Sequence, residues 1–158
     1  MDKAPGRIEG ETNRNRRLGI AWLFLCLAIA LHVLDEALSG FLSVYNPTAL
    51  VLRQRMPWLP LPVFTFRVWL LELSIGVAIL LLISRFMFRG DHWSRVLAGV
   101  LALLMIANGL MHIAGTMLGH SVASVHFARP MPGFYSSPLL LGASFYLLAQ
   151  LAKYQVRE

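Results

Sequence analysis

Long apolar runs separated by short polar segments dominate the chain. After a polar and basic stretch at residues 1–17, apolar residues predominate over 18–45, 63–86, 96–118 and 137–151. At a rise of about 1.5 Å per residue, such runs are typical of helices that cross a bilayer whose apolar layer is about 30 Å thick. The pattern predicts an all-α, integral membrane four-helix bundle at 18–152. A flexible basic tail (1–17) precedes it and a short tail (153–158) follows it.

Proline and glycine mark the ends of the predicted helices. Asn46-Pro47 is expected to end the first helix, because proline disfavours helix at the residue before it. The loop that follows holds Trp58 among prolines, which is typical of an interfacial segment. Gly90-Asp91 indicates a short turn between the second and third helices, and Pro132-Gly133 lies in the loop before the fourth.

Basic residues are unevenly divided between the two ends of the predicted bundle. Only Arg53, Arg55 and Arg129 lie in the other two loops, with Arg67 near its end of the second helix. The N-terminal tail, the turn between the second and third helices, and the C-terminal tail hold Lys3, Arg7, Arg14, Arg16, Arg17, Arg85, Arg89, Arg95, Lys153 and Arg157. Because cytoplasmic segments are enriched in Lys and Arg, we expect a multi-pass protein of the cell inner (cytoplasmic) membrane with both termini cytoplasmic.

Composition agrees with a membrane protein and excludes some functions. Hydrophobic residues make up 57% of the 158 residues and charged residues 14%, which is little charge for a soluble domain. The net charge of +6 comes from residues that flank apolar runs, so we expect no nucleic acid as a partner and membrane lipids instead. The single cysteine, Cys26, excludes an intrachain disulfide and a Cys-based metal site.

A few polar residues interrupt the apolar runs at helical spacing. His32, Asp35 and Glu36 share one face of the first helix, and Asn108 and His112 share one face of the third. Glu72 lies in the second helix. Because ionisable groups cost about 2.5–3.5 kcal/mol each in a bilayer, they are usually functional and face the bundle interior. Their similar depths predict one shared site, with the His120 and His126 loop covering its outer mouth.

Three explanations of this site fit the residue types. His32, Glu36, Glu72 and His112 could together hold a zinc or iron ion that activates water. The same groups could work without metal, with a buried carboxyl as general acid or base. They could also be structural, with His32 paired to Glu36 and His112 to Glu72. His120 and His126 are more simply ordinary loop histidines.

One motif resembles a known family. The segment His32-Val33-Leu34-Asp35-Glu36 is similar to the His-x-x-Glu-Glu signature of bacterial HXXEE membrane proteins, and Asn108-Gly-Leu-Met-His112 and Pro132-Gly133 extend the match. The resemblance implies a four-helix membrane fold and candidate residues but no reaction. Asp35 replaces the first Glu, and its shorter reach argues against a direct ligand role.

A looser similarity is to sterol isomerases of the emopamil-binding-protein type. Those proteins place His-x-x-x-Glu on one membrane helix, a Glu on the next and an Asn on a later one. His32 with Glu36, then Glu72, then Asn108 follow that order. This similarity implies an acid/base pocket that faces lipid.

Two hypotheses of function follow, with a third held behind them. The first is a membrane enzyme on a lipid or isoprenoid-like substrate. In it Glu36 and Glu72 are acid/base or ligand carboxylates, His32 and His112 are ligands or proton carriers, and Asn108 orients one of them. The second is a non-catalytic accessory or assembly subunit of a larger membrane complex, bound to a membrane-protein partner. The third is an ion-coupled carrier, for which four helices are few.

Overall fold

The structure is a computed structural model that describes the backbone of residues 5–155 and the side chains of 10–153. Within this range the chain is mostly helical with little strand, which confirms the all-α prediction. The elements in chain order are α1 (Pro5–Ser39), α2 (Leu42–Arg55), α3 (Phe66–Arg89), α4 (His92–Leu118), β1 (His120–Val122), β2 (Val125–His126) and α5 (Ser137–Gln155).

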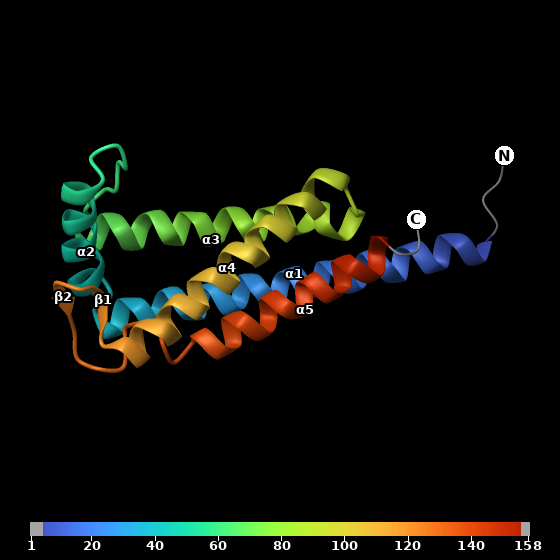
Figure 1. Ribbon diagram of the computed structural model, residues 1–158. Helices are drawn as coiled ribbons and strands as arrows, with labels where there is room; N and C mark the ends of the chain where they lie inside the picture. The colour runs from blue at the N-terminus through green and yellow to red at the C-terminus, as the bar shows by residue number, and fades with distance from the viewer. Residues whose placement is uncertain (1–4, 156–158) are drawn as a thin grey trace.

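Four helices run along the length of the molecule, and α2 lies across one end (Figure 1). The long helix α1 packs between α3 and α5, and α4 packs against α5. In contrast, α3 and α4 have few contacts, because α4 runs diagonally away from α3 after their common turn (Figure 1). The two helices therefore separate toward the α2 end.

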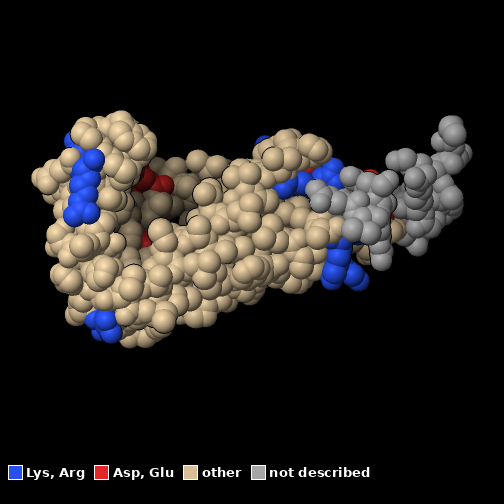
Figure 2. Space-filling model, viewed as in Figure 1, with Lys and Arg blue, Asp and Glu red and all other residues tan. Residues whose placement is uncertain are grey.

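Three segments are long and apolar enough to cross a membrane: Gly10–Ser39, Phe66–Arg89 and His92–Leu118. Large apolar side chains on α3 are exposed in a row, among them Leu71, Ile75, Ile79 and Leu82. Lys and Arg gather at the two ends of the molecule, and the visible flank between them carries none (Figure 2). An exposed apolar flank of this extent needs a cover of lipid or protein.

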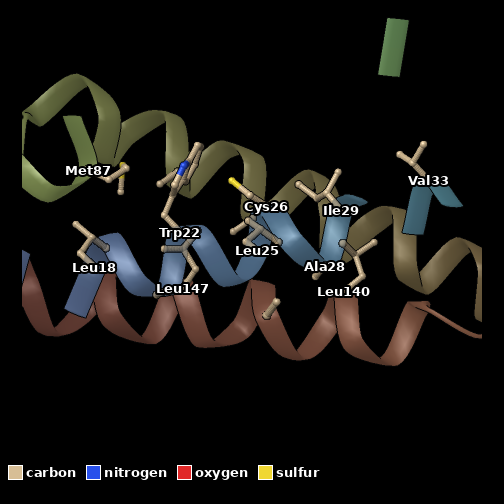
Figure 3. Close-up of a cluster of buried hydrophobic side chains, with 14 residues drawn as sticks. Leu18, Trp22, Leu25, Cys26, Ala28, Ile29, Val33, Met87, Leu140 and Leu147 are labelled. Carbon is tan, nitrogen blue, oxygen red and sulfur yellow. The ribbon is translucent and has the colours of Figure 1, made fainter. Parts of the chain in front are cut away.

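The apolar core surrounds the middle of α1. Trp22 is fully buried, and its indole Nε1 donates a hydrogen bond to the Leu80 carbonyl oxygen on α3 at 3.0 Å. Small residues on the facing helices, such as Ala98, Ala102 and Ala143, are also fully buried and permit close helix packing. The side chains labelled in Figure 3 are Leu18, Trp22, Leu25, Cys26, Ala28, Ile29, Val33, Met87, Leu140 and Leu147.

The predicted end of the first helix was wrong. The expected helix over 18–45 ends at Ser39, because Gly40 has a φ of 77° and the Phe41 N–H donates back to the Glu36 carbonyl oxygen at 3.0 Å. Asn46-Pro47 breaks nothing: Pro47 lies inside α2. It is the sixth residue of that helix, beyond the first turn, so α2 continues through a proline that supplies no backbone N–H. Asn46 instead fastens α2 to the following loop through two hydrogen bonds with the Phe64 backbone.

The predicted start of the first helix was also wrong, and the boundaries of the other three predicted helices moved by at most four residues. The segment expected as a tail at 1–17 is helical from Pro5 onward, and residues 1–4 lie outside the described part of the chain. The expected helices over 63–86, 96–118 and 137–151 correspond to α3, α4 and α5, which begin or end within four residues of those limits. Of the expected C-terminal tail, residues 153–155 continue α5, and 156–158 lie outside the described range.

Candidate functional site

Glu36 lies between the two predicted histidines at the α2 end of the bundle. Its Oε1 is 3.2 Å from His112 Nε2 on α4 and 3.6 Å from His32 Nε2 on its own helix. The three residues are 5%, 2% and 3% exposed. One α1 turn supplies His32 and Glu36, because residues four apart share a helix face, and α4 supplies the third member. The structure thus brings His32, Glu36 and His112 together.

These three residues have the donor set and spacing of a metal site. One ligand atom from each lies within 4.8 Å of the others. A tetrahedral ion with metal–ligand bonds of about 2.0–2.1 Å keeps its ligand atoms roughly 3.3 Å apart. The 3.2 and 3.6 Å separations around Glu36 are close to that value. Two imidazoles and a carboxylate could hold zinc or iron and leave a coordination position open.

His32 also makes contacts on both sides of its ring. Its Nε2 is 3.0 Å from Asn108 Oδ1, and its Nδ1 is 2.7 Å from Ser136 Oγ. Ser136 in turn bonds Asp35: its hydroxyl and its backbone N–H both lie 2.8 Å from Asp35 Oδ2. Asn108 therefore lies beside His32, and hydrogen bonds through Ser136 connect Asp35 to His32.

His112 is held by close packing more than by hydrogen bonds. Its Nδ1 is buried and has no hydrogen-bond partner among the described residues. Gly133, with a φ of 86°, lies against the ring, so that a Cβ there would come within 2.7 Å of His112 Cε1 and 3.1 Å of Glu36 Cγ. On another side the Phe41 ring lies 5.8 Å from the imidazole, centre to centre.

Glu72 is not part of this cluster. It is exposed, and within the described residues it has neither a hydrogen bond nor an ion pair. It lies one helical turn beyond Trp69, whose ring packs at 5.9 Å on Phe41, the neighbour of His112. Glu72 therefore belongs to the helix face that looks toward the site, but the structure does not place it among the ligand atoms.

A hollow opens in the flank of the molecule beside α2, where α4 has diverged from α3 (Figure 2). Asp or Glu atoms are visible inside it. The acidic residues at this end of the described chain are Asp35 and Glu36 near the end of α1 and Glu72 near the start of α3. Figure 2 is a side view of the helices, so the hollow opens sideways through the exposed apolar flank.

The segment that covers the site differs in part from the predicted one, the loop with His120 and His126. His120 and His126 pair across the β1–β2 hairpin with their rings 5.6 Å apart, and the hairpin packs on α2 and α4. The segment after the hairpin reaches the site instead, through Gly133 and Ser136. Sequence reasoning noted Pro132-Gly133 but missed Ser136 and Phe41, because neither falls on a polar stripe within a predicted helix.

No protein-family model, curated protein or solved structure matches the chain.

Proposed function

We propose that this protein is a multi-pass enzyme of the inner (cytoplasmic) membrane with a metal centre buried among its helices. In the proposal α1, α3, α4 and α5 form a four-helix membrane bundle with both termini cytoplasmic. His32, Glu36 and His112 hold a zinc or iron ion. The substrate is a lipid or an isoprenoid-like molecule. The resemblance to HXXEE proteins supports the membrane fold, and the looser resemblance to sterol isomerases supports an acid/base pocket that faces lipid.

The membrane placement is supported by the surface of the molecule. Three helices are apolar enough to cross a bilayer, and α5 packs along two of them. Arg14, Arg85, Arg89 and Arg95 lie at the end that holds both termini, which the enrichment of basic residues on the cytoplasmic side favours as the inner end. The exposed apolar row on α3 would then face lipid.

The observation that carries the metal centre is the position of Glu36 Oε1 between two imidazole nitrogens, at 3.2 and 3.6 Å, in a site that solvent hardly reaches. A bound zinc or iron ion supplies a Lewis acid that polarises a substrate oxygen or lowers the pKa of a water molecule. Three protein ligands leave room for either. Asn108, beside His32 Nε2, is placed to hydrogen-bond a substrate oxygen or to orient the histidine.

The hollow supports a substrate that arrives from the bilayer. Its opening lies in the apolar flank, so a lipid-like molecule would reach the polar cluster without crossing water. Glu72 supports the same hypothesis, because it is a carboxylate without a described partner on the helix face toward the site. In this proposal Glu72 is a general acid or base and not a metal ligand.

One observation favours the second hypothesis, a non-catalytic subunit of a larger membrane complex. Glu36 contacts His112 directly, and Asn108, Ser136 and Asp35 complete a chain of hydrogen bonds around His32. Such a network could serve only to join α1, α4 and α5. The exposed apolar flank would then be covered by a protein partner instead of lipid.

The metal content of the purified protein separates the two hypotheses. We expect close to one zinc or iron per chain in detergent-purified wild type, measured by mass spectrometry after metal-replete expression. His32→Ala, Glu36→Ala, Glu36→Gln and His112→Ala should lose it, and Glu36→Gln keeps the size of the side chain. The control His126→Ala, an exposed histidine outside the cluster, should keep it. A metal-free wild type would overturn the proposal and favour the structural role.

A further inference from the structure

Ser136 links two residues of the same turn of α1, His32 and Asp35, through hydrogen bonds to both. Its hydroxyl lies 2.7 Å from His32 Nδ1 and 2.8 Å from Asp35 Oδ2, and its backbone N–H donates to the same carboxylate oxygen at 2.8 Å. It is the last residue before α5, so this contact fixes the start of α5 against the end of α1. The result is a chain of hydrogen bonds from Asp35 through Ser136 to His32.

The number of available protons decides which group donates in each of these hydrogen bonds. The Ser136 hydroxyl has one proton and three acceptors near it: Asp35 Oδ2, the Gly133 carbonyl oxygen at 3.2 Å, and His32 Nδ1. A charged carboxylate at 2.8 Å is the strongest of these acceptors, because charge-assisted hydrogen bonds are about twice as strong as neutral ones. If Ser136 donates to Asp35, only the imidazole can donate between His32 Nδ1 and Ser136 Oγ.

We propose that Asp35 and Ser136 are a positioning pair that holds the proton of His32 on Nδ1 and so presents the lone pair of Nε2 to Glu36 and His112. The consequence for metal binding rests on the proposed function, but the position of the proton does not. Histidines that bind metals are usually oriented in this way, by donating the other ring N–H to a carboxylate or carbonyl group. Here Ser136 lies between the Asp35 carboxylate and His32 Nδ1 and accepts the hydrogen bond from the ring in place of the carboxylate.

The proposal also assigns the orientation of Asn108. If Nε2 carries no proton, its lone pair and a lone pair of the Asn108 amide oxygen face each other at 3.0 Å. Two acceptors repel at that distance unless a cation lies between them. In metal-free protein we therefore expect the amide to turn its NH₂ group to Nε2, which the equal shape of the two ends of an amide permits. A bound ion would instead favour the amide oxygen on this side.

Nitrogen NMR on metal-free protein tests the position of the proton directly. Detergent-solubilised protein with ¹⁵N-labelled histidine reports which ring nitrogen is protonated, and His32→Ala identifies the His32 signals. We expect the Nδ1–H form in wild type and in Ser136→Thr, which keeps the hydroxyl, and a change of form or a mixture in Ser136→Ala. An Nε2–H form in wild type, or the same form in Ser136→Ala, would overturn the proposal.

Metal affinity supplies a second readout. We expect Ser136→Ala and Asp35→Asn to bind zinc about 10–100-fold more weakly than wild type, with Ser136→Thr restoring most of the affinity. The matched control is Ser144→Ala, which removes a buried α5 serine that bonds only the Leu140 carbonyl oxygen and should leave affinity unchanged. Equal losses in Ser136→Ala and Ser144→Ala would overturn the positioning role. If the wild type binds no metal, the proposed function fails and the NMR result still decides the proposal.

Discussion

The two halves of α1 differ in what they contact. From Leu18 to Ile29 one face of the helix is buried against apolar and small side chains of three other helices, with Trp22 and Leu25 fully enclosed (Figure 3). From His32 to Ser39 the same helix turns polar groups toward α4 and the start of α5. One half is a close-packed apolar core and the other is a polar cluster beside a hollow.

The course of α4 explains this difference. Near the turn at Gly90 the ends of α3 and α4 lie close together, and small residues such as Ala98 and Ala102 fill the space against their neighbours. Toward α2 the two helices are apart and a hollow lies between them, while the three residues of the cluster remain buried (Figures 1 and 2). We infer that the apolar half supplies most of the stability and the polar half the chemistry, which makes the two separable by mutation.

Trp22→Ala should give the largest loss of stability. It removes a fully buried ring and the hydrogen bond from its Nε1 to the Leu80 carbonyl oxygen, and such truncations cost about 3–5 kcal/mol. The measurements are thermal unfolding in detergent and the rate at which buried Cys26 reacts with a maleimide, which should rise. Trp22→Phe, which keeps most of the packing, is the control and should lose about 1 kcal/mol.

The metal content of folded Trp22→Ala protein should remain that of the wild type, because the ring is remote from the cluster on the same helix. A variant that stayed folded and lost its metal would contradict the separation of the two halves.

Gly133→Ala should have an intermediate effect, confined to the polar half. A left-handed φ of 86° costs a residue with a Cβ roughly 1–2 kcal/mol, and the added methyl group would lie within 2.7 Å of the His112 ring. We expect a modest fall in the unfolding temperature and a marked fall in metal affinity. Gly142→Ala, where a Cβ meets nothing within 4 Å, is the control: it should leave metal affinity unchanged and raise stability by up to about 1 kcal/mol, because Ala is favoured over Gly inside a helix. Unchanged metal affinity in Gly133→Ala would contradict its role in holding His112.

Glu72→Gln should change stability least, within about 0.5 kcal/mol, because no described partner is lost. The expected effect of Glu72→Gln is instead on labelling by a carboxyl-specific reagent. Dicyclohexylcarbodiimide, an apolar reagent that modifies protonated carboxyl groups, should label Glu72 through the hollow, and Glu72→Gln should abolish that adduct in the intact mass. Glu36 should remain unlabelled, because it is buried against His112. Labelling at Glu36, or none at Glu72, would contradict the access from the flank.

The sequence alone predicted the four long helices and the turn of α1 that carries the polar cluster, but it assigned most of α2 to a loop. Apolar runs and the four-residue spacing of His32 and Glu36 are local properties, and the structure keeps them. Local pattern failed at the end of α1, where Asn46-Pro47 was a weaker signal than Gly40. Gly40 leaves the helical region of φ and ends α1, whereas α2 continues through Pro47.

Only the tertiary structure decided which polar groups meet. His112, Asn108 and Ser136 reach His32 and Glu36, and Glu72 does not join them, although its sequence spacing was equally suggestive. The rotation of each helix about its axis, the divergence of α4 from α3 and the path of the loop through Gly133 set these contacts. Periodicity along a chain gives the face of a helix but not the angle at which helices cross, because packing between distant side chains determines that angle.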